Sequence, residues 1–159
     1  MPEIHHYRAR TTWPGRTGLG YERYDRAHSL TADPAHGQWT LSSDAVFRGR
    51  PELLNPEQLI VAAASSCQLL SFLAIAARAR IDVLEYADQA EGFMSEADLP
   101  MRIGRIVLRP RIVVASRVSE QRVLHLLELA HQECYVANSL RSEIVIEPTV
   151  ERRPPMEDK

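Results

Sequence analysis

The stretch NPEQLIVAAASSCQLLSFLAIAARAR, residues 55–80, decides the fold because it predicts one long helix with a well-marked start. Asn55 suits the N-cap, Pro56 suits the first helical position, and Gln58 completes a capping-box pattern. The basic residues near Arg80 are favourably placed at the C-terminal end of the helix dipole. We therefore predict a helix that runs from Pro56 to about Arg80.

The middle of this helix is almost entirely apolar. From Leu59 to Ala77 there are 19 residues without a charge, and Cys67 lies among them. This length reaches that of a membrane-spanning helix, but six of the residues are alanine, and serines and a glutamine interrupt the run. We expect no membrane span and predict a helix buried on nearly all sides of a globular core.

Composition places the chain among ordinary globular proteins. It has 159 residues, of which 45% are apolar and 25% are charged, so one domain with a sizeable core is expected. The formal net charge is −2, and the arginines are scattered among acidic residues. No nucleic-acid partner is expected, because a basic surface is lacking.

The N-terminal residues MPEIHHYRARTTW are polar and charged, without the apolar core of a signal peptide. We therefore expect a cytoplasmic protein with reduced thiols. The chain has two cysteines, Cys67 and Cys134. A permanent disulfide between them is not expected in that compartment, while a pair that cycles between thiol and disulfide stays open.

The remaining pattern predicts an α+β fold of one domain over residues 1–150, followed by a flexible tail at 151–159. Ser119 is the expected N-cap of a second helix, and Asn138 is expected in a left-handed conformation at its C-terminus. The order is βββ-α-ββ-α-β, with a strongly curved antiparallel sheet and two helices. The predicted strands are residues 3–13, 20–31, 38–47, 81–94, 101–116 and 141–150, and the second helix is 118–140.

Each cysteine lies on the apolar face of a predicted helix, so two unrelated core cysteines are one interpretation. The surroundings favour a second one, because the helix is locally polar at both points. Cys67 has Ser65, Ser66 and Gln68 beside it, and Cys134 lies among His131, Gln132, Glu133 and Tyr135.

Other chemistries find little support. His131 and Cys134 are three residues apart on a helix, but no zinc-binding spacing occurs, so no metal site is expected. The chain has no GxSxG nucleophile elbow. Its glycine-rich loop GRTGLG joins two strands of a hairpin and does not lead into a helix, so it does not predict a phosphate site.

The segment NPEQLIVAAASSC closely resembles the signature of the OsmC/Ohr family, the osmotically inducible and organic hydroperoxide resistance proteins. In that family an N-P-E-x-L helix start precedes the reactive cysteine, and a second cysteine lies on the next long helix. The matching residues here are Asn55, Pro56, Glu57, Leu59, Cys67 and then Cys134 in AHQECYVANSL. RIVLRPRIVV looks like the family's strand between the helices, and the resemblance covers roughly residues 5–150.

The resemblance implies an intertwined homodimer with the cysteine-bearing helices at its centre. It implies a peroxidase that reduces organic hydroperoxides without metal or another cofactor. Cys67 would be the peroxidatic cysteine and Cys134 the resolving one, with a disulfide between them that a dithiol reductant resets. In some relatives that reductant is a lipoyl protein. The alternative is a small-molecule binder or structural stress protein of the same fold, without peroxidase turnover.

The resemblance also implies that Glu57 orients an arginine that holds the Cys67 thiolate. The first hairpin departs from the simplest family pattern, so Arg26, Arg16 and Arg23 all compete for this role; we favour Arg26 and place Arg16 second. Ten helical residues separate Glu57 from Cys67 by about 15 Å along the axis, and an arginine spans about half of that. Either the helix bends sharply between them, or the salt bridge and the cysteine come together across a dimer interface. We favour the interface and predict that each site borrows residues from the partner chain.

Overall fold

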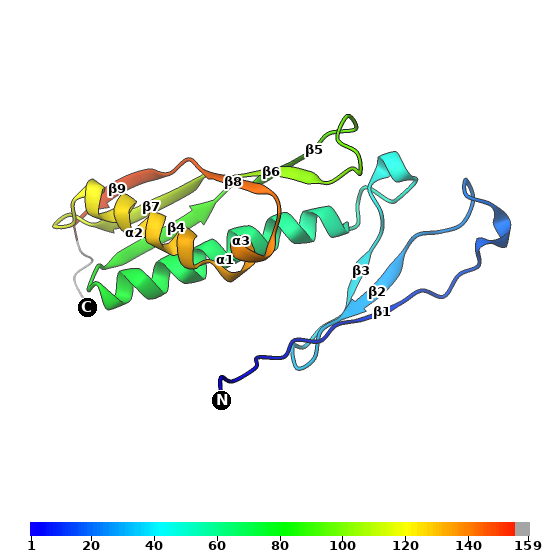
Figure 1. Ribbon diagram of the computed structural model, residues 1–159, viewed down its shortest axis with the longest axis horizontal. Helices are drawn as coiled ribbons and strands as arrows, with labels where there is room; N and C mark the ends of the chain where they lie inside the picture. Colours follow the sequence, from blue (N-terminus) through cyan, green and yellow to red (C-terminus); the bar gives the residue numbers. More distant parts are fainter. Residues whose placement is uncertain (155–159) are drawn as a thin grey trace. The chain divides into compact units, whose positions relative to one another are not determined.

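The computed structural model describes residues 1–154, and the chain groups into two compact units, residues 1–59 and 60–159. Figure 1 shows the elements of each unit. We describe each unit by itself. The prediction of one domain over residues 1–150 stays a prediction.

The N-terminal unit holds one small antiparallel sheet of order β1-β2-β3. Its strands are β1 (Arg10–Thr12), β2 (His28–Thr31) and β3 (Trp39–Leu41). Short 3₁₀ turns, η1 (Thr17–Leu19) and η2 (Ala45–Phe47), lie in the connections. The expected hairpin is confirmed, but all three predicted strands were too long. Residues 3–9 are exposed and pair with no strand in the described part of the chain, so a β-rich composition is not enough to make them a strand.

The helix α1 (Pro56–Arg78) begins as predicted. The Asn55 amide donates to Gln58 Oε1 at 3.1 Å, and the Gln58 amide donates to Asn55 Oδ1 at 2.8 Å, so the capping box is confirmed. The helix ends two residues before the predicted Arg80. Arg80 adopts a positive φ of 58°, and Ile81 donates to the Ala76 carbonyl at 2.9 Å. This Schellman-type end needs a left-handed residue, which is usually glycine, and the sequence therefore did not mark it.

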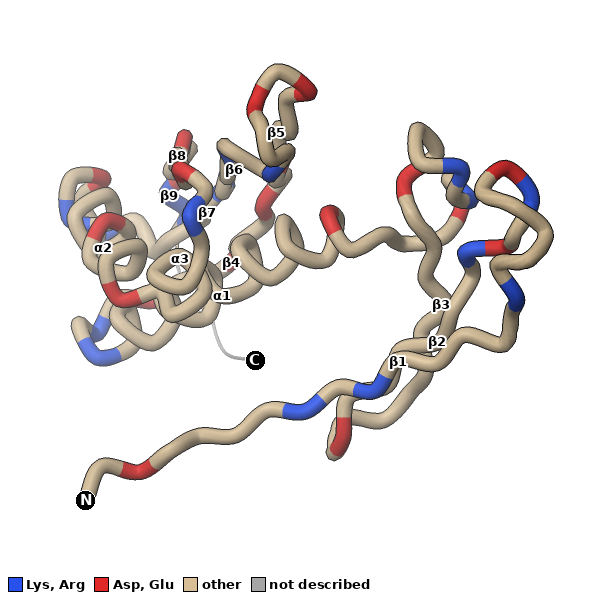
Figure 2. The backbone as a smooth tube through the Cα atoms, turned by 45° about the vertical axis from the view of Figure 1, so that its right-hand side comes forward, with Lys and Arg blue, Asp and Glu red and all other residues tan. Residues whose placement is uncertain are grey.

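The prediction that α1 is buried on nearly all sides was wrong. Its buried residues, Ala64, Gln68, Phe72 and Ala76, form a single stripe at a spacing of four. On other sides Leu70 is 64% exposed. By length and composition α1 could cross a membrane, and 22% of its most apolar window is buried. Figure 2 shows no charged residue along the helix between its two ends.

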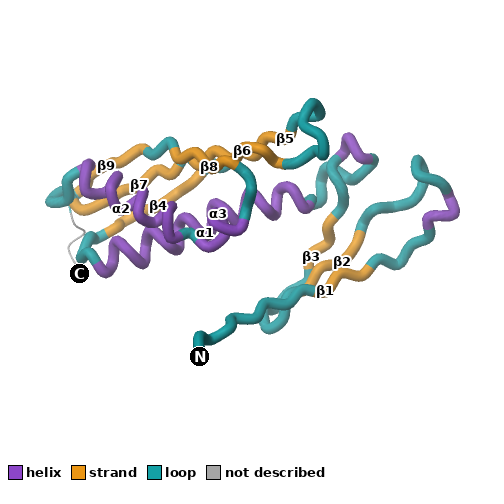
Figure 3. Tube along the Cα trace, viewed as in Figure 1, coloured by secondary structure: helices purple, strands orange, loops and turns teal. Residues whose placement is uncertain are grey.

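The second unit contains two three-stranded sheets on one side of its helices (Figure 3). One sheet joins β4 (Val83–Asp88), β7 (Pro110–Ala115) and β9 (Thr149–Arg153), and the other joins β5 (Glu91–Met94), β6 (Ile103–Leu108) and β8 (Glu143–Ile146). The pairs β4–β7 and β5–β6 are antiparallel, whereas β6–β8 and β7–β9 are parallel. The α+β class and the overall order are thus confirmed, and two pairings are parallel where we predicted an antiparallel sheet.

Four predicted elements are each divided into two in the structure: the last three strands and the second helix. The strands predicted at 81–94 and 101–116 bend where the Arg109 amide leaves the ladder and donates to Asp88 Oδ1 at 2.7 Å. Pro110 follows and has no amide to donate. Each long strand therefore contributes to both sheets. Residues 151–153, predicted as part of the flexible tail, belong to β9, while residues 155–159 lie outside the described part.

The predicted second helix is also divided, into α2 (Glu120–Glu133) and α3 (Tyr135–Ser139). Its start is confirmed, because Ser119 Oγ accepts a hydrogen bond from the Arg122 amide at 3.3 Å. The prediction for Asn138 was wrong, since this residue lies inside α3. The main core packs α1 and α2 on the β4-β7-β9 sheet, with fully buried members such as Phe72 and Val123.

Candidate active site around Cys67 and Cys134

Cys134 lies at the junction of two helices, where it is both the C-cap of α2 and the N-cap of α3. Its backbone is extended, with φ −67° and ψ 112°, and its Sγ accepts a hydrogen bond from the Ala137 amide at 3.4 Å. The Asn138 side chain supports the junction by donating to the carbonyls of Gln132 and Cys134 at 2.9 and 3.0 Å. The break thereby holds the sulfur of Cys134 in a defined place.

Cys67 lies in the middle of α1, and the tertiary structure brings Cys134 to it. Both cysteines are free, and the Cys134 side chain lies close enough to Cys67 to lower the pKa of the Cys67 thiol. Cys67 is half-buried, while Cys134 is 1% exposed. Two thiols far apart in the sequence thus form a pair with one accessible and one buried member.

The environment of Cys67 favours its thiolate. Burial by itself raises the pKa of this thiol, but four hydrogen-bonding groups outweigh burial and bring the pKa below its ordinary value. These groups are the Cys134 thiol, the backbone of Val136, the hydroxyl of Ser71 and the backbone of Tyr135. The donors come from the α2–α3 junction on one side and from α1 itself on the other.

The environment of Cys134 has the opposite effect. Burial, together with its hydrogen bond to Cys67, raises the pKa of Cys134 to about 11. The pair therefore has one thiol that ionises more readily than an ordinary cysteine and one that ionises less readily. This asymmetry is what a nucleophile and its proton-bearing neighbour require.

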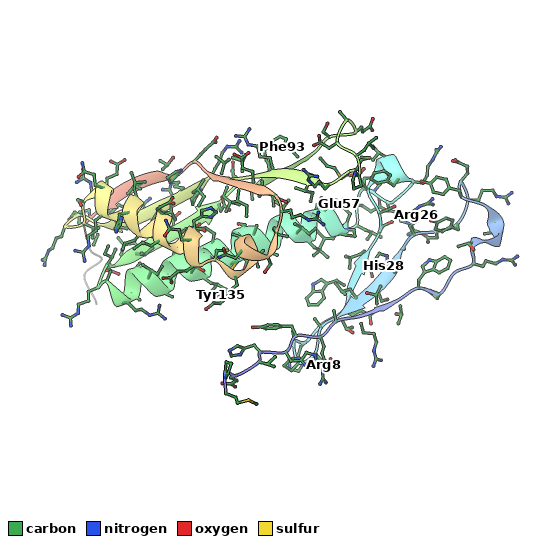
Figure 4. All side chains as sticks on the ribbon, in the orientation of Figure 1. Arg8, Arg26, His28, Glu57, Phe93 and Tyr135 are labelled. Atoms are coloured by element: carbon green, nitrogen blue, oxygen red, sulfur yellow. The ribbon has the colours of Figure 1, made fainter. Side chains whose placement is uncertain are left out.

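A pocket of about 230 Å³ opens beside Cys67. Its wall on α1 includes Leu70, Ser71 and Ile75, and Tyr135 contributes from the start of α3. Tyr135, labelled in Figure 4, is 83% exposed. The pocket gives a small, partly apolar molecule access to the more reactive thiol.

Arg26 belongs to the N-terminal unit, where it is held among aromatic rings. Its guanidinium lies 4.0 Å from the Tyr24 ring centroid and 4.8 Å from that of Tyr21, and it donates to the carbonyls of both residues. Arg26 and His28, labelled in Figure 4, line a pocket of about 400 Å³ with Trp13. Arg26 is half-buried, which suits a residue with a defined position.

The two competing arginines, Arg16 and Arg23, are exposed. Glu57 is half-buried in the first turn of α1 and forms no ion pair with Arg26 in residues 1–154. The roles of Arg26 and Glu57 at Cys67 therefore stay predictions.

Sequence reasoning missed three of the groups that face the Cys67 sulfur. The backbones of Tyr135 and Val136 reach it only because the helix breaks at Cys134, and no local signal marks that break. Ser71 had a signal, since a polar residue four positions after Cys67 shares its face of an otherwise apolar helix.

Comparison with known proteins places this chain in a family. The family described as "OsmC-like protein" matches residues 49–149. The chain belongs to the OsmC-like family. The predicted resemblance is confirmed, and the matched region contains both cysteines and Glu57.

Several solved OsmC-like structures are similar to this chain. An OsmC-like protein of unknown function from Vibrio cholerae is 30% identical, with a TM-score of 0.82 over 92% of this chain and 100% of that one. An organic hydroperoxide resistance protein from Elizabethkingia anophelis is 19% identical, with a TM-score of 0.69 over 96% and 100%. Among curated proteins, the uncharacterized protein YmaD of Bacillus subtilis is 24% identical over 85% of this chain and 81% of its own.

Proposed function

We propose that this OsmC-like protein is a cysteine-based peroxidase that reduces organic hydroperoxides to alcohols. The observation that carries the proposal is the contact between Cys67, whose pKa is lowered, and Cys134, whose pKa is raised to about 11. Neighbouring thiols whose pKa values are shifted in opposite directions are characteristic of reactive sites. The name of the Elizabethkingia relative agrees with the substrate class.

The reaction would begin with the Cys67 thiolate, which attacks the terminal oxygen of the hydroperoxide. The O–O bond breaks, Cys67 becomes a sulfenic acid, and the alkoxide leaves as the alcohol after taking up a proton. The Cys134 thiol then attacks the sulfenic sulfur, releasing water and forming a disulfide. Exchange with a dithiol reductant, such as a lipoyl protein, returns both thiols.

The positions of the two cysteines support this second step. Because Cys134 lies close enough to lower the pKa of Cys67, disulfide formation would need little displacement of α1 or of the α2–α3 junction. A quick second step protects Cys67 from further oxidation to sulfinic acid. We also expect the cytoplasm as the compartment, since the cycle starts from reduced thiols.

The working form would be a homodimer. Part of the apolar surface of α1 is exposed, including Ile60, Leu70 and Leu73. A second copy of the chain could bury this surface in a dimer interface. The helix is continuous from Pro56 to Arg78, so it separates Glu57 from Cys67 by about 15 Å along its axis. We therefore keep the prediction that Glu57 and Arg26 serve the Cys67 of the partner.

The test is to add less than one equivalent of cumene hydroperoxide to the reduced protein. We expect a disulfide between Cys67 and Cys134 within one chain, detected as a crosslinked peptide in a non-reduced digest. Free thiols should fall by two for each peroxide consumed. If both thiols still react fully with an alkylating reagent after peroxide, the two-cysteine mechanism is wrong and a binding role is favoured.

A further inference from the structure

The structure shows a polar residue next to Cys67 that the mechanism has not yet used. Ser71 follows Cys67 by four residues on α1, so the two side chains lie on the same face of the helix, one turn apart. Both line the pocket of about 230 Å³. Ser71 therefore lies beside Cys67 in the pocket that would admit a peroxide.

The hydroxyl of Ser71 is among the groups that lower the pKa of the Cys67 thiol. A serine inside a helix often donates instead to the carbonyl four residues earlier. Ser139 does this in α3, where its Oγ donates to the Tyr135 carbonyl at 2.7 Å. Ser65 of α1 donates to Asp88 Oδ2 at 2.5 Å. In residues 1–154 Ser71 forms no such alternative bond, so its hydroxyl is available to the sulfur.

We propose that Ser71 is a positioning residue that holds the Cys67 sulfur as a thiolate by donating a hydrogen bond from its hydroxyl. The sulfur would accept this bond along α1 and the bonds of the α2–α3 junction from the other side. Part of the stabilisation of the thiolate would then come from the same helix of the same chain. The inference rests on the proposed function only in taking the thiolate as the nucleophile.

The composition of α1 explains why a hydroxyl serves here. Burial raises the pKa of Cys67, so the site needs donors, yet no residue between Leu59 and Ala77 carries a charge. The charged residues that line the pocket are Arg78, eleven positions after Cys67 on α1, and Glu133 at the end of α2, and neither is among the groups that shift the pKa of Cys67. Burying a cation inside this apolar run would cost far more free energy of desolvation than burying a neutral, hydrogen-bonded hydroxyl. A donor one helical turn away is also held at a nearly constant distance from the sulfur.

The experiment measures the alkylation rate of Cys67 between pH 5 and 10 in the full chain, with the labelled peptides separated by mass spectrometry. Ser71→Ala should move the midpoint of the profile to higher pH and lower the rate at neutral pH by about threefold to tenfold, because a charged acceptor loses one donor. Ser66→Ala is the matched control, since Ser66 is exposed and adjacent to Cys67. It should leave the profile unchanged.

A second pair of variants separates the hydroxyl from packing. The side chains introduced by Ser71→Thr and Ser71→Val have the same shape and differ only in the hydroxyl. The Thr variant should therefore keep the midpoint of the parental pH profile, and the Val variant should shift it to higher pH as the Ala variant does. A midpoint that is equal in the Thr and Val variants overturns the inference. A midpoint that falls in the Val variant also overturns it, because Ser71 would then accept from the thiol.

The result is independent of peroxidase turnover. If the parent protein consumes no peroxide but the hydroxyl still sets the midpoint, the proposed function fails and the role of Ser71 stands. If the parent is an active peroxidase and the midpoint does not depend on the hydroxyl, the role of Ser71 fails and the proposed function stands.

Discussion

The two thiols should differ strongly in reactivity, and the structure allows the difference to be worked out. The pKa of Cys134 is raised to about 11, so at pH 8 about one molecule in a thousand has this thiolate. The pKa of Cys67 is below its ordinary value of 9.0, so at least about one molecule in ten has the Cys67 thiolate at that pH. The populations thus differ by at least about a hundredfold.

Part of this difference is offset by intrinsic reactivity. A thiolate of lower pKa is a weaker nucleophile, and over about two pKa units this removes roughly a factor of ten. We therefore expect Cys67 to be alkylated by iodoacetamide at least about tenfold faster than Cys134 at pH 8. Burial of Cys134, which is 1% exposed, can only increase the ratio.

The assay quenches the reaction at successive times and quantifies the two labelled peptides by mass spectrometry. The same reaction in concentrated urea is the control, because unfolding removes the contacts that separate the two thiols, and the rates should then agree within about twofold. Equal rates in the native protein, or faster labelling of Cys134, would refute the reasoning. Either result would mean that the junction of α2 and α3 does not donate to Cys67.

Three further predictions concern the pair, the dimer and the helix start. Cys67→Ser should abolish peroxide reduction. Cys134→Ser should complete one turnover and then accumulate sulfenic or sulfinic acid at Cys67, which mass spectrometry of the oxidised protein would detect. Equal loss of the first turnover in both variants would contradict these roles. Mixing Cys67→Ser chains with Glu57→Ala chains should restore up to one working site per mixed dimer, and no recovery despite proven exchange would place the whole site within one chain. Asn55→Ala should lower the free energy of unfolding by about 1 kcal/mol in urea denaturation, because the Gln58 amide loses its acceptor; an unchanged midpoint would show that the capping box contributes little.

Local signals predicted the elements whose causes are local. The capping box at Asn55 and Gln58 and the N-cap at Ser119 depend on residues within three positions of each other, and the structure confirms them. The family was likewise recognisable from the short segment that ends at Cys67, together with one distant cysteine. The Schellman-type end at Arg80 was missed, since arginine is an unusual residue for a left-handed position.

The sequence by itself determined that α1 exists, where it begins and that it carries a thiol in an apolar run. Only the tertiary structure decided what that thiol can do. The helix break at Cys134, the bend of the strands at Arg109 and the proximity of the two cysteines depend on groups that are distant in the chain. The pKa of a thiol is set by the burial and donors around its sulfur, and a linear pattern records neither until the chain has folded.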